Sequence, residues 1–578
     1  MRKIKRVIGY TLGIAMVLIA AIFLLNLHLT KRLERYLRKE LIHRTAEATD
    51  GFYRLSFDNL SISFFKGELT LEGIKLCPDS AVFRDWERKD SLPSTYVTAE
   101  VDMVDFKGLN LTWRWSYKQL HFDSFEIRNP DIQVFSPYYS TRAEVKERKE
   151  AETKTLYEVV SPYINVLTVR MLNLENASVS YSVENPVSPI VYALNDVSFH
   201  AYGFRLDENS SESGKLLYCD NFDFITKRSQ TLLANNDFRL QTDRILLSTE
   251  DSIISISNIT LTPQGELWGE QKKRPDSYLN ALIRAIEVKG IQFRRENALN
   301  YLTARSLDII SSDIQAFNLA GESLPSAKKT EKKSLNEAEA DSLVRSLSLY
   351  ELISPVLHTV SIGTVGIGQA KLQYSFAVKD KIEVYKLANF DFQANDFRID
   401  SVSEAQRGFW YSRGFSFEAT GIEGVMTARN HRFTVKRMTL DTESGDFNLE
   451  RIRLYPLSVC GQNDYMAGSI DTVGIRGLLY DKGISARLLK IDRPNLRYVL
   501  VSSFNKKDVK SVKPANSRVD VESILNPFLR YFSVKRLSLN HAYVTIDDKS
   551  MSDPVTYKLN DFNFFATGIW VNRQTGKG

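Results

Sequence analysis

The sequence predicts an all-β fold: an N-terminal transmembrane helix followed by tandem antiparallel β repeats that form an elongated curled sheet, with short helices at the repeat boundaries. Three observations predict this fold. Apolar and polar residues alternate over most of the chain, several sequence elements recur in a fixed order, and one long uncharged segment lies near the start. Helical patterns are confined to short stretches near residues 143–164, 278–288, 333–358 and 519–531.

The composition is that of a chain able to bury a core, with 43% hydrophobic and 25% charged residues. The 76 Lys and Arg residues nearly balance the 70 Asp and Glu residues, so the net charge of +6 does not favour a nucleic-acid partner. Cys77, Cys219 and Cys460 lie far apart without a CxxC pair, which argues against a disulfide framework or a thiolate metal site. We therefore expect no metal and no cofactor.

The segment from Val7 to Leu27 contains no charged residue and is long enough for a helix to cross about 30 Å of hydrocarbon. A cleaved signal peptide is the alternative, but the apolar run is too long and no A-x-A cleavage site follows it. We predict a cytoplasmic stub and signal anchor over residues 1–27, with residues 28–578 outside the cytoplasm. The residues expected to anchor the chain are Val7, Ile8, Leu12, Ile14, Val17, Leu18, Ile22, Phe23, Leu24 and Leu25.

A basic amphipathic helix is expected over residues 28–50. Its apolar residues recur at helical spacing and share one face: Leu29, Leu33, Tyr36, Leu37 and Leu41. Such a helix could lie on the outer leaflet of the same membrane, or it could pack on the first strands as an end cap. The sequence leaves both alternatives open.

After residue 50 the pattern changes to the period of two that is typical of half-buried antiparallel strands. Residues 53–78 alternate around an expected turn at Lys66–Gly67, and residues 96–106 and 120–135 continue the pattern. The alternation persists for hundreds of residues, as in Phe390/Phe392, Phe433/Val435 and Phe447/Leu449.

The chain contains internal repeats. Residues 156–207 overlay residues 349–400 at a shift of 193, with 16 of 52 positions identical, and a further shift of 172 places Pro355 on Pro527. A second element ends at Pro78, Pro263 and Pro456, and a third links residues 126–135 to 490–499. We predict β units over residues 51–155, 156–348 and 349–520, each ending in a charged linker, and a short fourth unit over residues 521–578. The short fourth unit suggests either a fragment or a cap.

No catalytic motif is present. The seven histidines are scattered without HExxH spacing, and the sequence has no GxSxG, P-loop or GxGxxG motif. Most Asp and Glu residues occupy the polar positions of alternating strands, where a solvated face is expected. The sequence therefore predicts a protein that is not an enzyme.

The first 136 residues resemble the opening of AsmA-like proteins of Gram-negative envelopes. An N-terminal anchor and a basic segment precede a strand pair of the form φxφxxφxφxxxxGxLxLxGφxL, and Asn129–Ile132 matches a later "xNPxφxφ" ending. The residues that match the strand pair are Leu55, Phe57, Leu60, Ile62, Gly67, Leu69, Leu71, Gly73, Ile74 and Leu76.

The resemblance to this family and its TamB-like and YhdP-like relatives implies a repeating β-groove, as in bridge-like lipid transfer proteins. It implies an inner-membrane protein with its bulk in the periplasm, carrying phospholipid toward the outer membrane. The partners would be phospholipid acyl chains, the inner membrane, and outer-membrane or envelope proteins. The residues expected to line the groove are Leu69, Leu71, Ile74, Phe122, Phe125, Ile127, Phe199, Phe390, Phe392, Phe433, Val435, Phe447 and Leu449.

Alternation alone also permits a different arrangement. Pairs of sheets could close into a row of β-sandwiches, which would suit an anchored envelope scaffold or binding protein without lipid transport. The two hypotheses differ in whether the apolar face of the strands is open or sealed by a second sheet.

Overall fold

The computed structural model shows a mostly antiparallel all-β chain that divides into two compact units. Unit 1 comprises Met1–Ile259 and Phe293–Arg295, and unit 2 comprises Thr260–Gln292 and Glu296–Gly578. The structure describes residues 31–136 (without 33, 64–65, 90–91, 94 and 115–116), 157, 161, 164–183, 190–210, 215–233, 238–263, 277–296, 299–318, 357–378, 381–406, 411–427, 430–458, 464–480, 484–501, 531–550 and 553–572.

Several sequence predictions concern residues outside these described ranges. The predicted anchor, residues 7–27, and the predicted unit boundaries near residues 155, 348 and 520 lie outside the described residues. In the part of the chain that is described, no helix combines the length and the apolar character needed to span a membrane.

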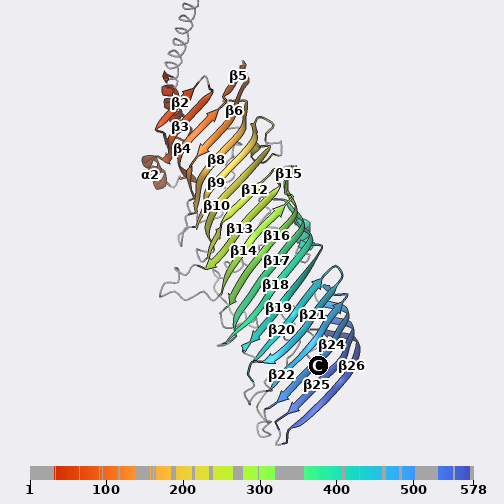
Figure 1. Ribbon diagram of the computed structural model, residues 1–578. Helices are drawn as coiled ribbons and strands as arrows, with labels where there is room; N and C mark the ends of the chain where they lie inside the picture. Colours follow the sequence, from red (N-terminus) through yellow and green to blue (C-terminus); the bar gives the residue numbers. More distant parts are fainter. Residues whose placement is uncertain are drawn as a thin grey trace, which may run out of the picture. The chain divides into compact units, whose positions relative to one another are not determined.

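Unit 1 holds a single curled sheet whose strands pair in one series (Figure 1). Its pairs are antiparallel except that β8 runs parallel to β6 and β7. The strands are β1 (Tyr53–Ser56), β2 (Asn59–Ser63), β3 (Glu68–Pro78), β4 (Tyr96–Lys107), β5 (Asn110–Arg114), β6 (Tyr117–Arg128), β7 (Asp131–Ser136), β8 (Val166–Val183), β9 (Ile190–Leu206), β10 (Asn221–Leu233), β11 (Phe238–Thr242) and β12 (Arg244–Ser248). They are followed by β13 (Ile253–Pro263), whose residues 260–263 belong to unit 2.

Unit 2 is built in the same way, with parallel pairs only at β16–β17 and β24–β25 among the described strands. Its strands are β14 (Ser277–Lys289), β16 (Leu299–Asn318), β17 (Thr359–Val378), β18 (Lys381–Ile399), β19 (Gly414–Met426), β20 (His431–Asp441), β21 (Asp446–Pro456), β22 (Tyr465–Arg476), β23 (Leu479–Tyr480), β24 (Ile484–Leu500), β25 (Tyr531–Asp548) and β26 (Val555–Asn572); β15 (Gln292–Glu296) contains residues of both units.

The parallel junctions coincide with the long connections that the sequence singles out. Parallel neighbours need a crossover of a dozen or more residues, whereas antiparallel neighbours can be joined by a tight turn. The chain between Ser136 and Val166, between Asn318 and Thr359, and between Leu500 and Tyr531 meets this requirement. The charged segments of the sequence are therefore the long crossover connections between the parallel strands.

The backbone repeats where the sequence repeats. Asn176, Gln369 and His541, related by shifts of 193 and 172, have φ values of 53°, 55° and 51° in the middle of long strands. Equivalent positive φ values occur in the second element at Gly73, Asn258 and Arg451, and in the third at Asn129 and Arg493. In the first element the register of the strand pair shifts beside the positive φ, as at a β-bulge. In the second and third elements the register is the same on both sides of Gly73, Arg451, Asn129 and Arg493. In both cases apolar residues change parity along the strand at this position.

Short helices lie at strand ends. Residues 31–32 and 34–48 are helical and bind the edge of β2, where Ile62 donates its N–H to Glu34 Oε1 (3.2 Å). Arg38 donates to the carbonyl oxygens of Phe57 (3.0 Å) and Asp58 (2.9 Å). These contacts hold the helix against the first strands. The other helices are α2 (Ser80–Arg88), the 3-10 turn η1 (Leu216–Tyr218) and α7 (Ser401–Gln406).

The helical pattern predicted near residues 278–288 is wrong, because these residues form β14. The spacing of their apolar side chains fits the helical period of about 3.6 residues as well as the strand period of two. These residues form a strand because they pair with β16 at twelve positions. Tyr278 and Ala281 are buried as a result, while Leu282 is 52% exposed.

The bulge at Gln369 can be tested by substitution. A residue other than glycine costs roughly 1–2 kcal/mol of stability when its backbone adopts the left-handed region, and the cost is largest for a β-branched residue. We expect Gln369→Val to lower the free energy of unfolding of the full chain by about 1–2 kcal/mol, and Gln369→Gly to maintain or raise it, in urea titrations followed by circular dichroism. Equal stability of the two variants would contradict the positive φ.

Candidate functional site

The candidate site is a set of apolar rows that cross the strands of each unit. In unit 1 the register links one residue per strand over nine strands, and every residue in this row is apolar. The row runs through Leu60, Leu71, Val104, Ile127, Leu174, Phe199, Phe224, Leu247 and Ile254. Directly paired residues share a face of the sheet, so the nine side chains form one continuous strip. A parallel strip follows Ile62, Leu69, Phe106, Phe125, Leu172, Ala201 and Phe222.

Unit 2 carries a longer row of the same kind over eleven strands. It runs through Ile286, Ile309, Ile367, Phe392, Phe417, Leu440, Phe447, Ile475, Leu489, Leu537 and Ala566. The neighbouring row is also entirely apolar: Ala370, Phe390, Ala419, Met438, Leu449, Val473, Ile491, Leu539 and Phe564. Phe390 packs on Phe417 with ring centroids 5.8 Å apart, so the two rows are in contact.

This face is open along its middle. All eleven residues of the longer row are half-buried, and in the unit 1 row Leu60 alone is fully buried. A second sheet packed on this face would bury such side chains completely, as in a β-sandwich core. Among the described residues, the strands of each unit form one layer with neighbours only on either side. Within the described residues, the apolar face is therefore covered by its own side-chain contacts and by segments at its rim.

At the rim, loops do seal parts of the face. In unit 1 Cys219, beside η1, is buried against Ala201 and Phe222, and burial together with the nearby Asp220 carboxylate raises the pKa of its thiol to about 11. In unit 2 Tyr411 and Leu357 pack beside the buried pair Val360 and Ile362. A thiol with this pKa stays protonated and unreactive at neutral pH.

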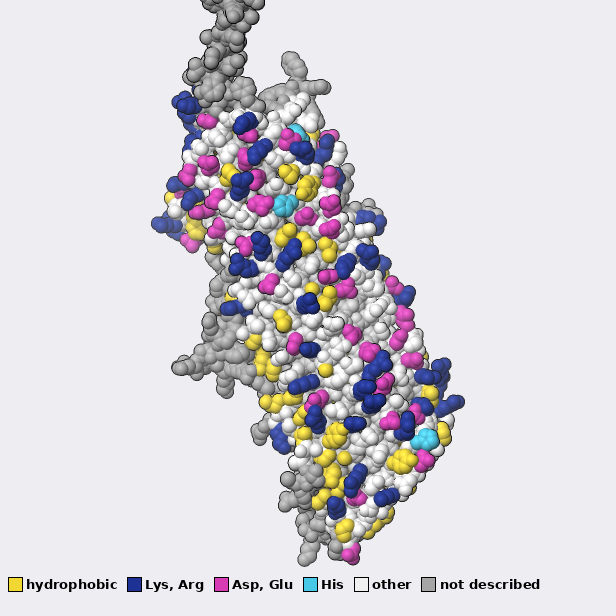
Figure 2. Space-filling model, viewed as in Figure 1, with side chains coloured by type: hydrophobic (Ala, Val, Ile, Leu, Met, Phe, Trp, Pro, Cys, Tyr) yellow, Lys and Arg dark blue, Asp and Glu magenta, His cyan; other side chains and the backbone are white. Residues whose placement is uncertain are grey.

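The opposite face of the sheet is polar. In unit 2 Arg437 donates to both carboxylate oxygens of Glu418 at 2.8 Å, and these hydrogen bonds lower the pKa of Glu418. Arg432 Nη2 forms a single salt-bridge contact with Glu423 Oε1 at 2.9 Å. Figure 2 shows Lys and Arg side chains interspersed with Asp and Glu over the visible surface. Exposed pairs of this kind contribute little to stability, so this face is a solvated surface.

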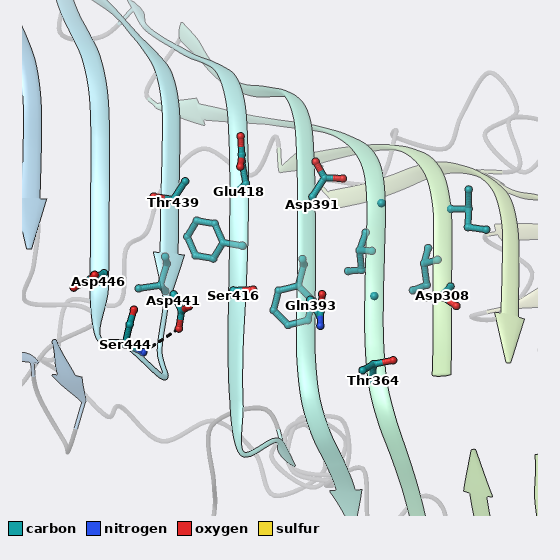
Figure 3. Close-up of a pocket in the computed structure, with 18 of the residues that line it drawn as sticks. Asp308, Thr364, Asp391, Gln393, Ser416, Glu418, Thr439, Asp441, Ser444 and Asp446 are labelled. Atoms are coloured by element: carbon teal, nitrogen blue, oxygen red, sulfur yellow. Dashed lines mark hydrogen bonds between the residues drawn. The ribbon is translucent and has the colours of Figure 1, made fainter. Parts of the chain in front are cut away.

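A hollow of about 940 Å³ lies over β16 to β21. Its lining includes five residues of the apolar row: Ile309, Ile367, Phe392, Phe417 and Leu440. It also includes a polar row that lies one residue away: Asp308, Gly366, Gln393, Ser416, Asp441 and Asp446 (Figure 3). Asp391, Glu418 and Thr439 form the next polar row. In the described part of the chain, no group of three or more His, Cys, Asp or Glu residues has a geometry that could hold a metal ion.

The structure brings many of the predicted lining residues together. Leu69 shares a row with Phe125, Leu71 with Ile127 and Phe199, Phe392 with Phe447, and Phe390 with Leu449. Phe122 contacts the same Phe106 ring as Phe125, at centroid distances of 4.9 and 4.5 Å. Beyond Gly73 and Arg451, Ile74 pairs with Val101, Val435 with Ile422 and Ile452, and Phe433 with Leu454.

Sequence reasoning missed most residues of the rows, including Ile309, Ile367, Phe417, Ile475 and Leu537. The signal was present for some of them, because a shift of 193 places Leu174 on Ile367 and Phe224 on Phe417. The sequence does not give the pairing register between strands, and only this register shows that such residues lie beside Phe199 and Phe392.

The chain matches no protein-family model and no curated protein. Among solved structures, one match is titled "Crystal structure of Sex pheromone staph-cAM373 precursor", with 10% sequence identity and a TM-score of 0.10 over 62% of this chain and 89% of that chain. A likeness this weak supports no argument about fold or function.

The open face can be distinguished from a sealed core by truncation. Phe392 is half-buried, whereas Phe415, which packs against it at a centroid distance of 5.8 Å, is 9% exposed. We expect Phe392→Ala to lower the free energy of unfolding by less than about 2 kcal/mol, and Phe415→Ala by roughly 3–5 kcal/mol, the usual cost in a closed core. Urea titration of the full chain measures both. If Phe392→Ala lowered the free energy of unfolding as much as a truncation in a closed core does, roughly 3–5 kcal/mol, the face would not be open.

Proposed function

We propose that the apolar face of this sheet binds the acyl chains of phospholipids and lets them move across the strands. The observation that carries the proposal is the eleven-strand row of unit 2, in which every residue is apolar and half-buried. Monomeric soluble proteins rarely expose contiguous apolar surface on this scale without a partner for it.

The dimensions of the row suit acyl chains. Eleven strands have ten intervals of about 4.8 Å, so the row extends roughly 48 Å along the sheet. Half of a bilayer's hydrocarbon core is about 15 Å thick, which is the reach of one extended acyl chain. The row of unit 2 therefore offers room for about three chains laid end to end. Each methylene group removed from water contributes about 0.8 kcal/mol, so binding needs no specific polar contact.

The chemistry of the face also suits movement. Its aliphatic and aromatic side chains offer no fixed hydrogen-bond partner, and rows of equal character lie side by side at Phe390 and Phe392. A bound chain can shift from one strand to the next while exchanging one apolar surface for another. The polar face opposite stays in water, so the sheet can pass through an aqueous space with lipid on one side.

Together with the anchor expected over residues 7–27 and the resemblance of residues 1–136 to AsmA-like proteins, these features support a specific function. The chain would be held in the inner membrane and would carry phospholipid through the periplasm toward the outer membrane. It would act without a catalytic step. The single-layer sheet in each unit favours this function over a scaffold of closed sandwiches.

Lipid co-purification tests the proposal with a matched control. Phe392 and Phe417 are cross-strand neighbours on the apolar face, and Gln393 and Ser416 are the adjacent neighbours on the polar face. We expect the full chain to retain phospholipid through purification and lipid extraction. Phe392→Asp with Phe417→Asp should reduce the bound lipid at least fivefold, since two charges would lie in the row.

The control variant, Gln393→Asp with Ser416→Asp, adds the same charges one residue away and should retain lipid at the level of the unmodified chain. Circular dichroism would establish that both variants keep their strand content. Equal lipid in the two variants, or no lipid with the unmodified chain, would contradict the proposal.

A further inference from the structure

A buried carboxyl group lies near the beginning of β18, at one rim of the apolar face in unit 2. Glu383 is 5% exposed and lies two residues before Tyr385, so the two side chains share a face of the sheet. The Tyr385 hydroxyl donates a hydrogen bond to Glu383 Oε2 (3.2 Å). Within the described ranges, no Lys, Arg or His side chain forms an ion pair with Glu383. Buried carboxylates are usually paired with a cation, so a cationic ligand would satisfy this group.

Aromatic rings adjoin this carboxyl group. Phe376 lies directly opposite Glu383 in the register of β17 and β18. Its ring stacks on those of Tyr374 and Tyr385, at centroid distances of 5.3 and 5.6 Å, and the Tyr385 ring lies 6.0 Å from that of Phe433. Tyr374 is 44% exposed, so this end of the aromatic series is accessible. We call Glu383 and these four aromatic residues the rim cluster.

The internal repeat shows that the fold does not require a carboxyl group at this position. Shifts of 193 and 172 place Glu383 on Ile190 and Val555, whereas the residue two positions later is tyrosine in all three copies. In each copy this residue pairs with the equivalent residue of the preceding strand, in β8, β17 and β25. A charged residue therefore occurs, in one copy alone, where the same strand geometry accepts an aliphatic side chain.

The rim cluster adjoins the apolar rows. On β18, Leu387 lies between Tyr385 and the row of Phe390, and Leu387 pairs with an apolar residue on each neighbouring strand. The strand rises about 13 Å from Glu383 to Leu387, and one extended acyl chain reaches about 15 Å. A phospholipid with its headgroup at Glu383 would therefore lay its acyl chains over Leu387 and toward Phe390.

We infer that the rim cluster binds the ammonium group of a phospholipid headgroup. The Glu383 carboxylate accepts charge-assisted hydrogen bonds from the ammonium, and the faces of the aromatic rings attract the same positive charge. A phospholipid without an amine, such as phosphatidylglycerol, carries a net negative charge and is disfavoured beside this carboxylate. The inference rests on the proposed function, because the acyl chains must lie on the apolar rows for the headgroup to reach this rim.

Photo-crosslinking tests the headgroup preference separately from acyl-chain binding. A photoreactive phenylalanine analogue at residue 374 of the full chain reports on lipid at the rim cluster, and the same analogue at residue 392 reports on lipid in the apolar row. The chain is reconstituted in vesicles of equimolar phosphatidylethanolamine and phosphatidylglycerol and irradiated, and its lipid adducts are quantified by mass spectrometry. We expect the ratio of phosphatidylethanolamine to phosphatidylglycerol adducts to be at least threefold higher at residue 374 than at residue 392.

Two variants assign this preference to Glu383. Glu383→Ile removes the carboxylate and introduces the residue that the first copy carries, so the strand should be retained, as circular dichroism would show. It should lower the ratio at residue 374 to that at residue 392. The control, Glu423→Gln, removes a carboxylate from the polar face, where Glu423 pairs with Arg432, and should leave the ratio unchanged.

Contrary results of two kinds can be told apart. Equal ratios at residues 374 and 392 in the unmodified chain, an unchanged ratio in Glu383→Ile, or the same loss of preference in Glu423→Gln would overturn this inference and leave acyl-chain binding in place. Adducts at residue 392 with none at residue 374 would do the same. Absence of adducts at both residues would overturn the proposed function and this inference with it.

Discussion

The cross-strand register is the constraint on which the rest of the structure depends. Each strand alternates apolar and polar residues, but a slip by one residue would place its apolar side chains on the solvated face. In unit 2 the register aligns Phe392, Phe417 and Leu440 in one row, and the adjacent residues Gln393 and Ser416 lie on the opposite face of the sheet. The bulges at Gln369 and His541 act within this constraint, because they shift the alternation at a fixed position and let the strand bend.

An open apolar face has an energetic consequence. The half-buried side chains of the rows gain less from folding than the side chains of a closed core, so main-chain pairing must stabilise a larger share of the sheet. Long strands meet this need, since β17 and β18 together register fifteen residue pairs. Small residues such as Ala177, Ala201 and Ala419, which are fully buried, bring neighbouring strands and side chains into close packing at the bulges and rows. The fold can therefore be stable while its apolar face stays accessible.

Much of this fold follows from the sequence, and the exceptions have physical causes. Alternation predicts the strands, and the shifts of 193 and 172 predict recurring backbone features that the equivalent bulges bear out. The turn at Lys66–Gly67 is confirmed by the φ of 63° at Gly67. At residues 278–288 the apolar pattern fits two periods, and pairing with β16 selects the strand. Individual lining residues such as Phe392 could be named from the sequence, whereas their neighbours in a row depend on long-range pairing.

Photo-crosslinking along one strand can show whether lipid occupies the apolar face of the sheet, as we propose. A photoreactive phenylalanine analogue would be placed in turn at residues 390, 391, 392 and 393 of β18 in the full chain in membranes. We expect phospholipid adducts at residues 390 and 392, and none at residues 391 and 393, because successive residues face opposite sides. Adducts at all four residues, or at none of them, would contradict it.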